Sequence, residues 1–286
     1  MRGVRRARGV HGGEGRAPTR LGGVLSRLSR PRVLALCGAP ALALFAVAAL
    51  APLPYVLAQP GSTANVLGED KGEPVITITG APVRETTGEL LMTTIVATGP
   101  SVDIDLGQVV DAWFRTDRAV MPKEAVYPTG DTDAEIEKHN AAEMEQSQET
   151  AVDAALGHLG RSPDQVKVDL NLADIGGPSA GLLFSLGIVD KLDGDGSGGG
   201  LTGGRTIAGT GTITSDGDVG PVGGVPLKTQ AARRDGATVF LVPEEECAQA
   251  RAEKPEGLRL VPVTTLKDAV RALVALERKS GKVPSC

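Results

Sequence analysis

The sequence predicts an α+β protein of mixed small sheets and helices, preceded by a single transmembrane helix. Residues 33–58 are apolar and carry no charge, which is long enough to cross a bilayer. Beyond them, short alternating segments typical of strands are interspersed with segments of helical periodicity. Aromatic residues make up only 2% of the chain. The core must therefore be built from Val, Leu, Ile and Ala.

The charge pattern divides the chain. Residues 1–32 hold nine arginines and one acidic residue, and such a basic stretch before an apolar segment predicts a cytoplasmic tail. We therefore expect a single-pass anchor at 33–58 in the cell membrane, with the rest of the protein extracytoplasmic. A cleaved signal peptide ending at Ala58 is the alternative, which the length of the apolar stretch disfavours.

The remainder of the chain carries a net charge of −13. An acidic domain repels nucleic acid, so nucleic acid is excluded as its partner. Residues 59–72 have the composition of a linker. An N-terminal extracytoplasmic region follows at 73–160, with strands joined by a hairpin-like return and a long helix capped by Asp131 or Thr132. Its expected strands are 75–79 and 90–96, and its expected helices are 106–114 and 133–159.

Residues 161–286 form the second predicted region, in which strands alternate with helices. The glycine-rich stretch 193–200 superficially resembles a calcium loop, but the required glutamate is missing, so no metal is expected. Asp216-Gly217 marks a hairpin turn. The expected strands are 166–170, 206–214, 237–242 and 258–261, and the expected helices are 179–191, 226–234 and 265–278.

Two glycine-flanked motifs are candidates for chemistry. Residues 176–181 (GGPSAG) present Ser179, and residues 220–228 (GPVGGVPLK) present Lys228. The first motif also matches the nucleophile elbow of α/β-hydrolases, whose histidine follows the serine. The three histidines here, His11, His139 and His158, all precede Ser179. That triad is therefore excluded. Because His139 and His158 lie in a polar helix as expected surface residues, a nucleophilic Ser179 has a lysine, a carboxylate or no side chain as its base.

Lys228 has the surroundings of a neutral lysine. Its neighbours are apolar and it lies in the first turn of a predicted helix, where desolvation and the helix dipole both lower a lysine pKa. Because Pro178 has no N–H, the amides of Ser179 and Ala180 are the candidate oxyanion donors. Taken alone, Lys228 could be a surface lysine and the serine motif a turn with a helix cap.

Together the two motifs resemble the proteolytic domain of Lon-type proteases. The resemblance runs from about Val166 to Val274 and includes GPSAG at 177–181, LTGG at 201–204, GTG at 209–211 and DGDVGPVGG at 216–224. Residues 71–160 resemble the N-terminal region of membrane-anchored bacterial Lon-like proteases that usually carry a PDZ domain. The resemblance implies Ser179 as nucleophile and Lys228 as general base. Thr202 is then a candidate for orienting the lysine, or an ordinary turn threonine.

The chain departs from this family pattern at three places. It has no P-loop sequence, so cleavage is expected to be independent of ATP and of any cofactor. The stretch between Gly160 and Val166 leaves no room for a PDZ domain. Gly176 stands where cytosolic Lon proteases place an acid, and Asp174 lies two residues earlier.

The leading hypothesis is a membrane-anchored serine endopeptidase that cleaves extracytoplasmic proteins or peptides. The rival is a catalytically weak Lon-like scaffold that binds peptides, and an esterase is a third alternative. The family resemblance also implies a homo-oligomeric ring. Cys247 and Cys286 are the two cysteines beyond the anchor, and an oxidising compartment favours a disulfide between them.

Overall fold

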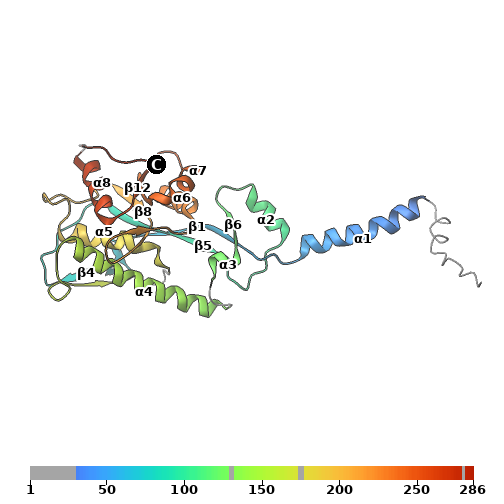
Figure 1. Cartoon of the computed structure of the whole chain (residues 1–286), viewed down its shortest axis with the longest axis horizontal. Coiled ribbons are helices and arrows are strands. Elements are labelled where there is room, and N and C mark those ends of the chain that lie inside the picture. Colours follow the sequence, from blue (N-terminus) through green and yellow to red (C-terminus); the bar gives the residue numbers. More distant parts are fainter. Residues whose placement is uncertain (1–29, 129–131, 173–176, 279–280) are drawn as a thin grey trace, which may run out of the picture. The chain divides into compact units, whose positions relative to one another are not determined.

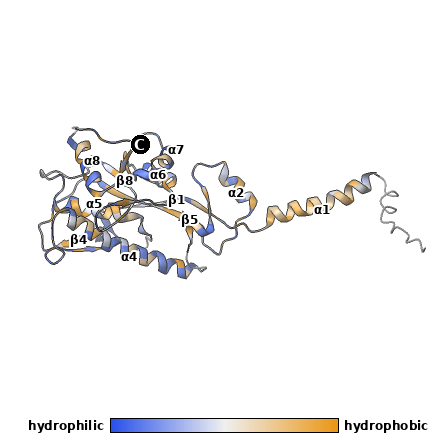
Figure 2. Cartoon of the chain, in the orientation of Figure 1, coloured by the Kyte–Doolittle hydropathy of each residue, from blue (hydrophilic) through white to orange (hydrophobic). Residues whose placement is uncertain are grey.

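The computed structural model of the protein describes residues 30–128, 132–172, 177–278 and 281–286 (Figure 1). Contacts divide the chain into two units, Met1–Ala51 and Pro52–Cys286. The first unit contains helix α1 (Arg30–Leu50), which includes Pro40 and is hydrophobic over most of its length (Figure 2). Among the residues that the structure describes, no helix combines the length and apolar character needed to cross a membrane. The transmembrane helix at 33–58 is not supported and stays a prediction from the sequence.

The second unit is built on a mixed sheet. Within the described residues it has six strands, in the order β12-β11-β8-β5-β1-β6. The first four run parallel, and β1 pairs antiparallel with both β5 and β6. The strands are β1 (Tyr55–Asn65), β5 (Glu89–Ala97), β6 (Ala119–Pro122), β8 (Thr206–Gly209), β11 (Val239–Pro243) and β12 (Arg259–Val263).

Alternation along the strands builds a core on each face of this sheet. Leu90 and Met92 enter one apolar cluster, whereas Leu91 between them enters the other. Successive side chains of a strand point to opposite faces, so helices cover both sides. The first cluster is completed by α4 (Asp133–His158), α5 (Gly181–Leu192) and α8 (Leu266–Arg278), and the second by α6 (Val225–Arg234) and α7 (Cys247–Ala252).

The linker predicted at 59–72 is wrong, and so is the boundary predicted at residue 58 between the anchor and that linker. Residues 55–65 form β1, an interior strand with Val56 and Ala58 buried. An apolar run fits a membrane helix and a buried strand equally well. Pro52 and Pro54 lie between α1 and β1, and proline cannot continue a helix. No structural boundary separates 73–160 from 161–286, because β5 and β6 share one sheet with β8.

The smaller sheets correct another expectation. The predicted hairpin between 75–79 and 90–96 does not form. Instead, β4 (Ile76–Thr79) pairs with β7 (Lys167–Leu170). The register opposes Ile78 to Val168, so both strands turn their apolar side chains to the same core. The other short pairs are β2 (Glu69–Asp70) with β3 (Glu73–Pro74), and β9 (Thr212–Ile213) with β10 (Val219–Gly220).

The predicted helices are confirmed with small shifts in their bounds. Helix α4 begins after Thr132, whose hydroxyl accepts a hydrogen bond from the Glu135 amide in a capping box. Asp131, the other candidate cap, lies outside the described residues. The predicted strand 206–214 is divided into β8 and β9 by Thr210 and Gly211. The remaining helices are α2 (Leu106–Trp113), α3 (Lys123–Val126), η2 (Pro178–Ala180) and η3 (Glu244–Glu246).

Candidate active site

The turn that carries Ser179 is held by helix α4. Gly177 has φ 95°, a backbone conformation that strongly favours glycine. Its amide donates to the carbonyl of Asn140 at 3.1 Å. The hydroxyl of Ser147 donates to the carbonyl of Pro178 at 3.1 Å. Gly177 and Pro178, the two residues before Ser179, are therefore both bound to one helix.

The backbone of Ser179 is also bound to the loop that follows β8. Its carbonyl accepts from the amide of Gly211 at 3.0 Å and from the hydroxyl of Thr210 at 3.3 Å. The amide of Leu182 donates back to the carbonyl of Gly211 at 3.2 Å. The serine, which is half-buried, thus lies at the carboxyl end of a parallel strand, where α/β sheets commonly bind ligands.

Lys228 comes to the same loop from helix α6. Gly224 caps this helix with φ 71° and accepts the Lys228 amide at 3.0 Å. The Lys228 side chain is only 3% exposed. Its Nζ donates to the hydroxyl of Thr210 at 3.1 Å. Thr210, itself fully buried, therefore accepts from Lys228 and donates to the Ser179 carbonyl, which joins the two predicted residues in one network.

The environment of Lys228 favours its neutral form. Burial lowers its pKa from 10.5 to about 8, against the opposing effect of the Glu246 carboxylate. A pKa of about 8 leaves about one tenth of the amine neutral at pH 7. A buried, partly neutral amine can accept the proton of a serine hydroxyl, which a fully charged surface lysine cannot.

Thr202 has a different environment from the one the resemblance implied. It is fully buried, but its hydroxyl donates to the carbonyl of Thr87 and accepts from the amide of Gly204 at 3.3 Å. The hydroxyl bound to the lysine is that of Thr210. Ala180 is buried and is the N-cap residue of α5, so its amide lies at a helix N-terminus, where backbone N–H groups favour an anion. Asp174 and Gly176 lie outside the described residues.

A pocket of about 220 Å³ adjoins the serine turn. Pro178 and β9 form one side of it, with Thr212 and Ile213, and α4 forms the other, with Ser147 and Thr150. Its walls are mainly polar.

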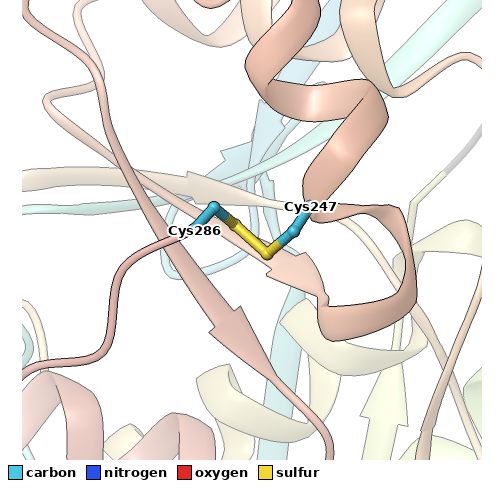
Figure 3. The surroundings of a disulfide bond; sticks show 2 residues. All are labelled: Cys247 and Cys286. Carbon is cyan, nitrogen blue, oxygen red and sulfur yellow. A yellow bond between two sulfur atoms is a disulfide. The ribbon is translucent and has the colours of Figure 1, made fainter.

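The disulfide expected between Cys247 and Cys286 is present, with a Cα–Cα distance of 5.3 Å (Figure 3). It ties the C-terminal residue of the chain to the start of α7. Both half-cystines pack against the core cluster that contains α6. The bond therefore belongs to the face of the sheet that carries Lys228.

Comparison with known families gives a match to the part of the chain that contains Ser179 and Lys228. Residues 166–275 match the Lon protease (S16) C-terminal proteolytic domain. The matched segment includes Ser179, Thr210, Lys228 and Glu246. A Lon-type proteolytic domain supports a serine peptidase.

Curated relatives agree with this match. The chain is 35% identical to the Lon protease of Chloroflexus aggregans over 105 residues, which cover 35% of this chain and 12% of the relative. It is 30% identical to Lon protease 2 of Bacillus subtilis over 118 residues, or 39% of this chain and 20% of the relative. The matched segments thus span a fifth or less of the length of these relatives.

Two residues of the site were not singled out from the sequence. Thr210 lies in the GTG stretch at 209–211, which pointed to the family but not to the lysine. Glu246 ends a run of three glutamates that resembles a solvated surface segment. Their signals are weak because tertiary folding, rather than spacing along the chain, brings both residues to Lys228.

Proposed function

We propose that this protein is a serine endopeptidase in which Ser179 is the nucleophile and Lys228 the general base. The observation that carries the proposal is the buried lysine, whose amino group reaches the Thr210 hydroxyl bound to Ser179. Its lowered pKa gives it the proton affinity that a base needs near neutral pH. The match to a Lon-type proteolytic domain supports the same chemistry.

In the proposed reaction, Ser179 Oγ attacks the scissile carbonyl carbon while neutral Lys228 takes the hydroxyl proton. The proton passes to the leaving amine nitrogen as the peptide bond breaks, which leaves an acyl-enzyme. Water then attacks the ester, with Lys228 again acting as base, and the serine is restored. The amides of Ser179 and Ala180 remain the candidate donors to the oxyanion.

The substrates are proposed to be flexible protein segments, cleaved without ATP because this chain carries no P-loop sequence. The extracytoplasmic location and a membrane anchor in the apolar stretch before β1 are also proposals. The disulfide supports an oxidising compartment, and the arginine-rich residues 1–32 support the orientation. A homo-oligomeric ring remains an implication of the family resemblance.

The test is degradation of unfolded casein by the full chain without ATP. Ser179→Ala and Lys228→Ala should each abolish cleavage. Ser215→Ala and Lys267→Ala, at exposed positions, should leave it unchanged. Absence of cleavage by the folded wild-type protein would refute the peptidase and favour the peptide-binding scaffold. Cleavage that survives Lys228→Ala would show that the base is wrongly assigned.

A further inference from the structure

Glu246 is a buried carboxylate without a role in the proposed reaction. It ends η3 and is only 4% exposed, whereas the preceding Glu244 and Glu245 are exposed. Carboxylates are rarely buried unless they have a partner. The burial of this glutamate within a run of exposed ones therefore calls for an interaction that compensates for lost hydration.

One partner of Glu246 is the segment that leads into helix α6. Its Oε2 accepts a hydrogen bond from the amide of Val222 at 3.1 Å. Val222 follows β10 and lies six positions before Lys228 in the sequence. The bond therefore connects η3 to the stretch from which the lysine-bearing helix begins.

The other partner is Lys228 itself. Burial raises the pKa of Glu246, while the Val222 amide and the positive charge of Lys228 lower it and the charge of Glu245 raises it. In return, the negative charge of Glu246 raises the pKa of Lys228 against the effect of burial. The two buried groups thus influence each other's protonation.

The chain also fixes the position of Glu246 covalently. The next residue, Cys247, is bonded to Cys286. Three positions before Glu246, Pro243 ends the buried strand β11 directly before η3 begins. Glu246 is therefore held between a strand of the main sheet and a disulfide. A group held from both sides can position another segment, since it has little freedom to move away.

We propose that Glu246 is a positioning residue of the peptidase site. Its carboxylate holds the segment before α6 through Val222 and acts electrostatically on Lys228. The peptidase role rests on the proposed function, whereas the two physical interactions do not. When Glu246 is ionised, Lys228 retains its proton to higher pH, and when Glu246 is protonated, Lys228 becomes neutral at lower pH.

The experiment is an NMR titration of the full chain labelled with ¹³C at lysine Cε, which reports protonation without requiring catalysis. The Lys228 signal is assigned by its loss in Lys228→Met. Glu246→Gln keeps an oxygen that can accept from Val222 but removes the charge, so the titration of Lys228 should shift to lower pH. Glu244→Gln, which removes an exposed charge from the same segment, should leave the titration unchanged.

An unchanged Lys228 titration in Glu246→Gln would overturn the electrostatic role. Glu246→Ala removes the acceptor as well, so it should lower the melting temperature and kcat more than Glu246→Gln does. Identical behaviour of these two variants would overturn the role of the Val222 bond. If Lys228 shifts as expected but the wild type cleaves no casein, the proposed function fails while the coupling of the two residues stands.

The pH profile of casein cleavage gives the second readout. Its acidic limb should move to lower pH in Glu246→Gln, in the same direction as the NMR titration. A change in kcat with no movement of the acidic limb would indicate a merely structural glutamate.

Discussion

Lys228 and Thr210 form a buried hydrogen bond, 3.1 Å from Nζ to the threonine hydroxyl. Thr210 also donates to the carbonyl of Ser179. A hydroxyl that accepts from the lysine and donates to the serine backbone fixes the relative positions of helices α5 and α6. The proposed nucleophile and base come from opposite faces of the sheet and meet at the end of strand β8.

The shared hydroxyl gives the first prediction. Thr210→Val keeps the side-chain shape but removes both hydrogen bonds, so kcat/KM for a peptide substrate should fall about 100-fold through misplacement of the base. Thr210→Ser should retain most of the activity. Steady-state kinetics of the three proteins provide the measurement.

Thr202→Val is the matched control, because Thr202 is equally buried but bonds to the Thr87 carbonyl. It should cost about 1–3 kcal/mol of stability and leave kcat/KM of the folded enzyme unchanged. A larger loss of activity in Thr202→Val than in Thr210→Val would restore Thr202 as the orienting residue.

The pKa of Lys228 gives the second prediction. Because the neutral amine is the active form, kcat/KM should rise with pH along an acidic limb with a midpoint of about 8. Below that midpoint it should fall about tenfold per pH unit. Profiles between pH 5.5 and 9.5 provide the measurement.

Variants of the histidines test whether a histidine, rather than Lys228, is the general base. His139 pairs with Glu143 on the surface of α4, and His158 is the last residue of that helix. His139→Gln and His158→Gln should leave the acidic limb in place. A limb near the usual histidine pKa that disappears in either variant would contradict the assignment of Lys228.

The third prediction concerns stability. The folded protein releases the Lys228 proton near pH 8, while the unfolded chain holds it to about 10.5. The unfolded state binds more protons between these values, so this group's contribution to stability rises with pH across that window. Below pH 8 the burial of the charged Lys228 lowers the free energy of unfolding by its full amount, about 3 kcal/mol for this difference in pKa.

Lys228→Met removes that cost. It should therefore raise the free energy of unfolding at pH 7 by up to about 3 kcal/mol, and by less at pH 9.5, while it abolishes activity. Urea denaturation at both pH values tests this, with Lys267→Met as an exposed control. A variant that is less stable than the wild type at pH 7 would show that Lys228 is not strained by its burial.

Most of the secondary structure could be predicted from the sequence. Capping signals and helical periodicity identified α4 and α8. Alternation identified β5, and β11 was predicted as a buried strand. Strand β1 was missed because its apolar start continues the stretch assigned to the anchor. The pairing of β4 with β7 was missed because strands far apart in the sequence are matched by the shared core, which local pattern does not encode.

The site could be predicted only in part. Ser179 and Lys228 stand in recognisable motifs, and the structure joins them through Thr210. The choice of Thr202 followed the family resemblance, but its hydroxyl turns to Thr87. Glu246 could not be recognised, since only the fold buries it while it leaves Glu244 and Glu245 exposed.

The disulfide gives the fourth prediction. It joins residues 39 positions apart, and closing a loop of that size stabilises a protein by about 4 kcal/mol through the unfolded chain. Cys286→Ser should lower the melting temperature without a reductant. Reductant should lower it for the wild type and have little further effect on the variant. Equal melting temperatures of the two oxidised proteins would contradict a stabilising role.

The most direct test of the central claim is the intact mass of the full chain after reaction with a fluorophosphonate, which labels activated serines. The account predicts one adduct on wild-type protein, mapped to Ser179, and none on Ser179→Ala. Labelling of Lys228→Met should be lost, because no base remains to take the serine proton. Equal labelling of wild type and Lys228→Met, or an adduct on another serine, would contradict the serine–lysine site.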